Sequence, residues 1–194
     1  MLKGDLNMIE KEEVNVNLSS AYKLVHPMHT VLVSCIDRHS RPNIITLAWA
    51  MPTSINPPLV AISVAPKRHS HALIEETKEF VVNIPTTSVL KETLFCGRRS
   101  GRDYDKFKET GLTPVPARKV KPPVIKECAA HLECKLYTRF ETGDHTVFVG
   151  EVVAAYAHKQ MFKDKYELRR AKMIFHLGGN DFATLKPEIF TPMV

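Results

Sequence analysis

Short runs of β-branched and apolar residues, each closed by prolines or turn residues, are the feature that most restricts the fold of this chain. Residues 30–36, 43–49, 59–65 and 80–84 form four such runs, and Pro85 ends the last one. Runs of this length and composition are typical of buried strands. The intervening prolines at positions 52, 57 and 58 indicate a loop between the second and third runs. We therefore expect the first half of the chain to consist mainly of strands.

The middle of the chain has helical composition instead. We expect a short helix over residues 70–77 with Ser70 as its N-cap, because a serine hydroxyl readily accepts a hydrogen bond from the first helical turn. Residues 88–95 and 103–110 favour two further helices, and Gly111 stands where a C-terminal cap belongs. We interpret this stretch as a helical insertion between strands.

The second half returns to strands. Four prolines within 114–123 predict an extended connection, and apolar residues then alternate with polar ones over 132–140. Residues 142–144, with the sequence Thr-Gly-Asp, can turn this strand into a return strand over 145–157. Residues 173–185 predict a last hairpin around a Gly-Gly-Asn turn.

Six to eight strands with only a few short helices favour a mainly β fold. We expect a small, largely antiparallel β-barrel with helical decoration, rather than a doubly wound parallel sheet. The chain has 194 residues, which is an ordinary size for one domain. We expect residues 1–20 to be an N-terminal lead-in and residues 21–190 to be one domain.

The charge balance favours an anionic ligand or partner. Lysine and arginine number 27 against 21 aspartates and glutamates, which gives a net charge of +6. Nucleic acid is one such anion, but no aromatic nucleic-acid motif accompanies the charge, so we expect no nucleic-acid partner. The longest apolar run, 59–65, is far shorter than the roughly 20 residues of a membrane helix, and the charged start has no apolar signal core. We expect a cytoplasmic protein with no membrane association.

The four cysteines predict neither a zinc site nor a redox pair. Cys35, Cys96, Cys128 and Cys134 include no C-x-x-C pair, so we expect reduced thiols. The pair His69-x-His71 lacks a third ligand nearby, and we expect no metal.

Residues 63–71 are the sharpest local feature, because they bring two cations, two imidazoles and a hydroxyl to the start of a helix. Unpaired N–H groups at a helix start attract anions, so this segment is a candidate phosphate cradle. A solvated basic turn with Ser70 as a plain cap is the competing interpretation. A second basic loop, 98–102, and His145 beside the hairpin turn allow the same two interpretations.

Several well-known catalytic motifs are missing. The sequence holds no G-x-S-x-G elbow, no phosphate-binding P-loop, no G-x-G-x-x-G fingerprint and no H-E-x-x-H. A serine hydrolase, a P-loop enzyme and a zincin are therefore unsupported.

Taken in order, a series of segments resembles the flavin reductase-like family of FMN-binding split barrels, which includes the flavoredoxins. The segments most specific to that family are a Pro-Pro-Leu-Val strand at 57–60, a Phe-Val-Val-Asn-Ile-Pro strand at 80–85 and a Gly-Asp-His turn at 143–145. Residues 177–180, Leu-Gly-Gly-Asn, also match the family, and the resemblance extends over about residues 22–185. It implies a split β-barrel of antiparallel, Greek-key type and a homodimer with one FMN per subunit.

The resemblance also implies a cofactor site. Thr46, Leu47, Ala48 and Trp49 would border the flavin ring system, and Ser63, Val64 and Ala65 would line its other side. Arg68, Ser70 and His71 would hold the phosphate, and Ser100 and Lys106 would close the site. His145 is the candidate catalytic residue on the open face of the flavin, because an imidazole can orient a nicotinamide or donate a proton.

The implied function is that of an FMN-binding oxidoreductase, a flavin reductase-like enzyme using NAD(P)H. It would transfer electrons from a reduced nicotinamide or another donor, such as a redox protein, through bound FMN to flavin or a redox partner. A flavoredoxin-like electron-transfer protein without NAD(P)H activity is the alternative, and a basic anion-binding or nucleic-acid-binding barrel without flavin is a third. Trp49 departs from the small residues typical of the reductases at this position, and a bulky indole there favours a tightly held FMN over a freely exchanged one.

Overall fold

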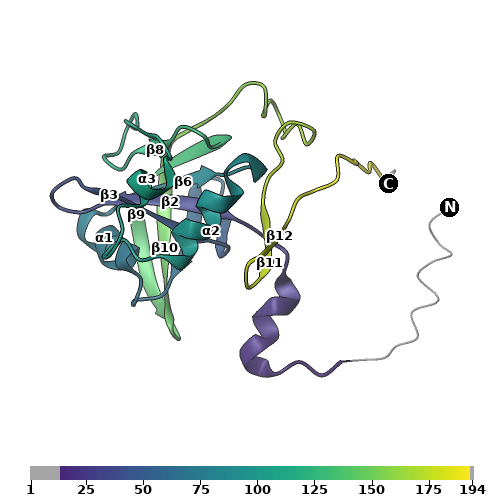
Figure 1. Ribbon diagram of the computed structural model, residues 1–194, viewed down its shortest axis with the longest axis horizontal. Helices are drawn as coiled ribbons and strands as arrows, with labels where there is room; N and C mark the ends of the chain where they lie inside the picture. The colour runs from purple at the N-terminus through teal and green to yellow at the C-terminus, as the bar shows by residue number, and fades with distance from the viewer. Residues whose placement is uncertain (1–13, 193–194) are drawn as a thin grey trace.

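The apolar runs form one rolled antiparallel sheet in the computed structural model, which describes residues 14–192 (Figure 1). The seven strands follow the order β3-β2-β6-β9-β10-β5-β4, and β3 also contacts β5, so the sheet curls back on itself. They are β2 (Val31–Ile36), β3 (Pro42–Leu47), β4 (Ala50–Ser54), β5 (Leu59–Val64), β6 (Glu79–Ile84), β9 (Ala130–Thr142) and β10 (His145–Ala157). The predicted mainly β, antiparallel fold is confirmed.

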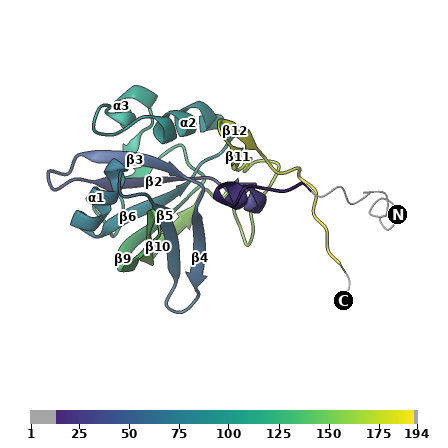
Figure 2. The same ribbon diagram turned by 90° about the horizontal axis from the view of Figure 1, so that it is seen from below.

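Short helices and two small sheets surround this barrel. Helices α2 and α3 pack on β3, and Figure 2 shows them together over one face of the barrel. The helices are η2 (Leu18–Val25), α1 (His69–Thr77), η3 (Thr87–Val89), α2 (Leu90–Arg98) and α3 (Lys106–Thr110), of which η2 and η3 are 3-10 helices. The small sheets contain β1 (Met28–His29), β11 (Phe175–Gly178) and β12 (Asp181–Ala183), and β7 (Pro114–Val115) with β8 (Val124–Ile125).

Strand β2 is buried along its whole length because it lies between two cores, and Ser34 is its one polar residue. Val31 and Val33 belong to the cluster inside the barrel, whereas Leu32 belongs to a second cluster with Ile44 and Phe107 beneath α2 and α3. Side chains alternate between the two faces of a strand, so a strand buried on both faces has no polar alternation. This position explains why the run is almost entirely apolar, and the hydroxyl of its one polar residue, Ser34, accepts a hydrogen bond from Asn83 Nδ2.

The long hairpin of β9 and β10 depends on two glycines. A Cβ on Gly150 would lie 2.5 Å from Cζ of Phe80 and 2.8 Å from Cβ of Cys134, so only glycine leaves room for that phenyl ring in the barrel. Gly143 has φ +59° in the turn, a conformation that favours glycine. Thr142 pairs with His145 across the turn. The predicted hairpin is confirmed, and it places His145 beside its turn.

Two sequence predictions in this part of the chain are wrong. Residues 50–54, expected in a loop, form β4, which tolerates Pro52 because it lies at the edge of the sheet. Helix α1 begins at His69 with Arg68 as N-cap, so Ser70 is not the cap. Ser70 is 2% exposed, and its Oγ accepts a hydrogen bond from Nδ2 of Asn43 at 2.7 Å.

The two ends of the described chain meet on one side of the barrel. Met28 of β1 pairs with His176 of β11, and β11 pairs with β12, so a small terminal sheet forms beside η2 (Figures 1 and 2). The expected lead-in over 1–20 falls largely outside the described residues, as does the charged start. Between residues 14 and 192, no helix is long and apolar enough to cross a membrane.

Candidate functional site

A cavity of about 310 Å³ lies where the barrel, α2 and the terminal sheet meet. We call it the aromatic cavity, because Tyr22, Trp49 and Phe182 are among its lining residues. The predicted site residues that line it are Thr46, Leu47, Ala48, Trp49, Ser63, Ala65, Arg68 and His145. Ala48 and Trp49 connect β3 to β4, and the Trp49 carbonyl accepts a hydrogen bond from Ser63 N at 2.9 Å, which fixes this corner against β5.

A second cavity of about 240 Å³ lies between the start of α1 and the loop after α2. We call it the basic cavity, because six of its lining side chains are lysine or arginine and none of its lining residues within 14–192 is acidic. The cations are Lys67, Arg68, Arg98, Arg99, Arg102 and Lys106. The predicted residues Ser70 and Ser100 also line it. Uncompensated positive charge in a concave site favours an anion.

The two cavities are neighbours and form one groove. Ile45, Arg68, Gly97 and Arg98 line both of them. A Cβ on Gly97 would lie 3.2 Å from Cβ of Thr46, so this glycine lets α2 approach β3 closely where the cavities meet. One end of the groove is therefore flanked by aromatic rings and the other by cations.

Lys106 is the most buried cation of the groove. It is 4% exposed, and its Nζ donates hydrogen bonds to the carbonyls of Ile44 and Cys96, each at 2.7 Å. Burial lowers the pKa of Lys106. An ammonium carries three N–H donors, so the two carbonyls leave one donor for a ligand in the basic cavity.

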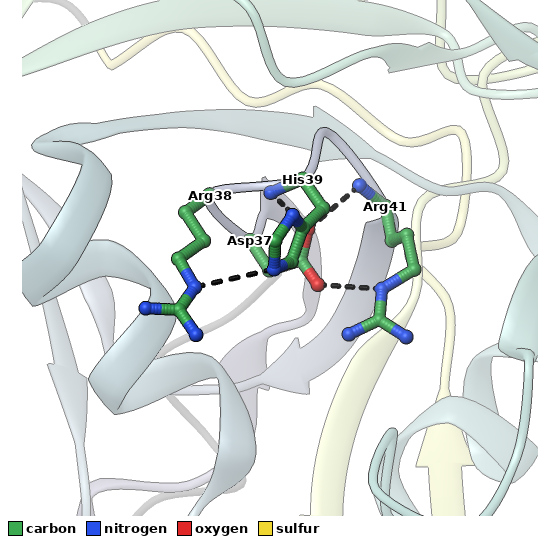
Figure 3. Close-up of polar contacts among 4 residues, drawn as sticks. All are labelled: Asp37, Arg38, His39 and Arg41. Carbon is green, nitrogen blue, oxygen red and sulfur yellow. Dashed lines mark hydrogen bonds and ion pairs between the residues drawn. The ribbon is translucent and has the colours of Figure 1, made fainter.

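Asp37, the acidic residue of the β2–β3 turn, accepts all its hydrogen bonds from residues of the same turn (Figure 3). Oδ1 of Asp37 accepts from the backbone N–H groups of His39 and Arg41 at 2.8 and 2.9 Å, and Oδ2 accepts from Nε of Arg41 at 2.6 Å. The backbone N–H of Arg41 is the main cause of the lowered pKa of Asp37. The charges of Asp37 and Arg41 both act on His69, and their signs oppose each other. The turn carries Arg38 and Arg41 against the single acid Asp37, so its formal charge is positive.

His145 lies against Trp49 at the aromatic cavity. The two ring centroids are 4.8 Å apart, and Nδ1 of His145 lies 2.7 Å from Oδ1 of Asp144. This contact with His145 is the main cause of the lowered pKa of Asp144. Trp49 also packs edge-on against Tyr22, with ring centroids 5.8 Å apart. The hairpin turn thus holds an imidazole in the wall of the cavity.

Three buried polar atoms in the lining residues lack a hydrogen-bond partner within the described chain. They are Oγ1 of Thr30 and both ring nitrogens of His26. Buried polar groups are nearly always hydrogen-bonded, because leaving one unpaired costs about 1–3 kcal/mol. These atoms suit a cavity that holds a polar ligand.

Val64 and His71 are the two predicted site residues that line neither cavity. Val64 is 1% exposed and belongs to the core inside the barrel. His71 is 8% exposed, and its Nε2 lies 2.8 Å from Oγ1 of Thr146, so it joins α1 to β10. Among residues 14–192, no three histidine, cysteine or acidic side chains gather as metal ligands would, and all four cysteines are buried thiols.

Sequence reasoning missed the residues that the chain ends and α2 contribute to the groove. They are Tyr22, His26, Thr30, Thr93, Leu94, Gly97, His176, Gly179 and Phe182, together with Arg98, which had been noted only as part of a basic loop. Nη2 of Arg98 donates to the Gly179 carbonyl at 2.6 Å and so joins α2 to the β11–β12 turn. The Gly-Gly turn was the available sequence signal for the terminal hairpin, whereas nothing in the sequence pointed to His26 or Thr30.

The chain is similar to several known proteins. An uncharacterized protein of Archaeoglobus fulgidus is 38% identical over 87% of this chain and 94% of its own length. The NADH-dependent FAD reductase of Streptomyces globisporus is 30% identical over 60% of this chain and 63% of its own. The solved structure of flavoredoxin from Desulfovibrio vulgaris has a TM-score of 0.79 and 28% identity, covering 86% of this chain and 91% of that one.

These likenesses confirm the predicted split-barrel fold. The model of the flavin reductase like domain matches residues 24–176, which include the barrel, α2 and the hairpin that carries His145. The chain therefore belongs to the flavin reductase like domain family.

Proposed function

We propose that this protein is an FMN-binding oxidoreductase. The observation that carries the proposal is the single groove with an aromatic end and a basic end. FMN has a matching shape, since a flat tricyclic ring is joined through a ribityl chain to a phosphate. Binding of an anion alone would explain the basic end of the groove but not its aromatic end.

The basic cavity suits the phosphate. Arg68 lines both cavities, and the free donor of Lys106 and the hydroxyl of Ser100 lie in the lining of the basic one. Charge-assisted hydrogen bonds to phosphate are among the strongest that side chains make. Ser70 has a supporting role, because its hydroxyl is hydrogen-bonded to Asn43.

The aromatic cavity suits the ring system, bordered by residues 46–49 on one side and by Ser63 and Ala65 on the other. When bound, the flavin supplies hydride and electron transfer. Backbone N–H groups near Thr46 and Ala48 are the candidate donors to the pyrimidine edge, where negative charge develops on reduction. His145 is the candidate group for orienting a nicotinamide or giving up a proton, and Asp144 positions its ring.

Trp49 favours a retained flavin. The indole contacts both Tyr22 and His145, so three aromatic rings lie together in this part of the cavity lining. A flavin ring held against these three rings would lose part of its contact with water, which favours retention. We propose that FMN is prosthetic rather than a substrate that leaves after each turnover.

A second copy of the chain is the proposed partner. Exposed apolar residues gather on η2, where Leu18, Leu24 and Val25 are 89%, 71% and 68% exposed. Tyr22, on the same helix, is 46% exposed and also lines the aromatic cavity. Light scattering on the purified protein tests the homodimer, and a Leu24→Glu variant should dissociate it.

The electron donor separates the two candidate functions. A reductase oxidises NADH or NADPH with added FMN at a steady rate, as the likeness to an NADH-dependent FAD reductase suggests. The likeness to a flavoredoxin favours the alternative, an electron carrier whose bound flavin is reduced chemically but by neither nucleotide. The test is the visible spectrum of the purified protein, chromatography of the released chromophore, and then nucleotide oxidation. Absence of both native flavin and uptake of added FMN would refute the proposal.

A further inference from the structure

The chain ends build a wall of the aromatic cavity, and apart from Tyr22 the residues of this wall have no role in the proposed flavin contacts. We call this set the terminal wall: Tyr22, His26, Thr30, His176 and Phe182. We propose that the terminal wall binds a second ligand, a small planar carboxylic acid, beside the flavin. The proposal rests on the FMN-binding function above and names the class of molecule that the flavin meets.

Unpaired polar atoms identify the contact points. Thr30 is 1% exposed, and its Oγ1 has no partner within residues 14–192; the same holds for both ring nitrogens of His26. A hydroxyl and an imidazole N–H are donors that a carboxylate accepts well. A ligand carboxylate at this wall would therefore satisfy groups that the chain leaves unsatisfied.

The rings of the terminal wall form a continuous series. The centroids of Tyr22 and His26 are 5.9 Å apart, those of His26 and His176 are 5.3 Å apart, and those of His176 and Phe182 are 5.3 Å apart. Through Tyr22 the series continues to Trp49 and His145. A planar conjugated molecule finds edge and face contacts along such a wall.

The basic side chains in the lining of the aromatic cavity favour a negatively charged ligand over a neutral one. Three of the nine histidines of the chain line this one cavity: His26, which caps the C-terminus of η2, His145 at the start of β10, and His176 in β11. Arg68 and Arg98 line it as well, and no lining residue within the described chain is acidic. Among residues 14–192, the one carboxylate in contact with these imidazoles is that of Asp144, which is 94% exposed and lies outside the lining. A neutral planar molecule would stack but leave the donors unpaired.

The test uses benzoate as the probe and benzamide as its neutral counterpart. Benzoate is titrated into the FMN-loaded protein while flavin absorbance and the fluorescence of Trp49, the single tryptophan, are recorded. We expect saturable binding of benzoate and affinity for benzamide about tenfold weaker, because a charged acceptor forms the stronger hydrogen bonds. No saturable change with benzoate, or equal affinity for both probes, would overturn the proposal.

Two variants separate a ligand contact from a structural role. Thr30→Val removes an unpaired hydroxyl at nearly constant shape, so the melting temperature without benzoate should stay equal or rise. The same change should weaken benzoate binding about fivefold, and His26→Ala should do likewise. His158→Ala, at an exposed histidine just beyond β10 that lines neither cavity, is the control and should leave benzoate affinity unchanged. Benzoate affinity that is unchanged in both cavity variants would refute the assignment.

Loss of the flavin function would be recognised separately. A protein that takes up no FMN contradicts the proposed function, and that result is visible before benzoate is added. Trp49 fluorescence still reports occupancy of the cavity in that case. A benzoate response that depends on His26 and Thr30 would then support the terminal wall alone, and a response independent of both would contradict it.

Discussion

Two regions of this protein contain buried polar groups, and these groups are hydrogen-bonded within the chain in one region and unpaired in the other. On the β6–β9 side of the barrel, the carboxylate of Glu133 is fully buried and accepts hydrogen bonds from the backbone N–H groups of Arg118 and Lys119 at 2.8 and 2.6 Å and from the Tyr156 hydroxyl at 2.9 Å. In the groove, the cations of the basic cavity face no acidic lining residue within 14–192, and Thr30 Oγ1 is unpaired.

This difference separates two kinds of buried polar group. Those with hydrogen-bond partners inside the chain stabilise the fold, and those without one are candidates for contact with a ligand. Asn83, near Glu133, is also saturated: its Nδ2 donates to the Leu32 carbonyl, and its Oδ1 accepts from Ile125 N at 3.0 Å. These bonds attach the proline-rich connection to the barrel. A satisfied cluster gains nothing from a further partner, whereas an unsatisfied one gains stability when a partner arrives.

The largest expected effect comes from breaking the saturated cluster. Glu133→Gln should lower the free energy of unfolding by about 2–3 kcal/mol, because a buried carboxylate loses charge-assisted hydrogen bonds. Urea denaturation measures this loss. FMN affinity should stay the same, because Glu133 lines neither cavity. A variant of unchanged stability would contradict the assignment.

The same residue gives a dependence on pH with a definite sign. Burial raises the pKa of Glu133, but the N–H groups of Arg118 and Lys119 and the Tyr156 hydroxyl outweigh it, so the folded pKa lies below the ordinary value. The stabilisation is therefore present above the unfolded pKa and is lost as the pH falls through the folded pKa. We expect the wild type to lose more stability on acidification than Glu133→Gln does. Equal acid sensitivity in urea titrations would argue against this.

Lys106→Met should affect both stability and binding. The variant keeps the apolar stem but leaves the carbonyls of Ile44 and Cys96 without their donor, so unfolding should cost about 1–2 kcal/mol less. FMN should bind more weakly as well, because the basic cavity loses a cation. Loss of stability with unchanged FMN affinity would make Lys106 purely structural.

Arg68→Ala should weaken FMN binding about tenfold, since one charge-assisted phosphate contact is lost. Stability should change little, because the side chain is exposed. Arg170→Ala, also exposed, lines neither cavity and serves as the control. Equal FMN affinities of the two variants, measured by flavin fluorescence quenching, would remove Arg68 from the site.

The smallest effect on affinity is expected from His145→Ala. FMN should remain bound, while reduction by a nicotinamide should slow on the order of 100-fold if the imidazole transfers a proton or positions the donor. Stopped-flow absorbance follows the reduction. A normal rate would leave His145 as a residue that only packs against Trp49.

The sequence predicted the elements whose own residues decide their structure. Strands such as β5 are short and rich in β-branched and apolar residues, and Gly143 and Gly111 both have the positive φ that their turn and cap positions require. The sequence did not predict β4, because Pro52 is unfavourable in a central strand. Only the sheet order, which places β4 at the edge, explains why a proline is tolerated there.

For the candidate site, neighbouring residues were predictable and distant ones were not. Residues 46–49 come to the groove together, as one continuous corner of the chain. His26 and His176 are brought together by the pairing of β1 with β11, which joins the two ends of the chain. His71 was misplaced because its side chain turns to Thr146 of the barrel instead of the groove. No local pattern encodes such long-range contacts.

Equilibrium binding of FMN and of riboflavin to the flavin-free protein tests the central claim most directly. The two molecules share the ring system and differ in the phosphate. The groove predicts one FMN per chain and an affinity for FMN at least about tenfold above that for riboflavin, because the basic cavity binds the phosphate. Equal affinities, or no saturable binding of FMN, would contradict the assignment of the groove to this cofactor.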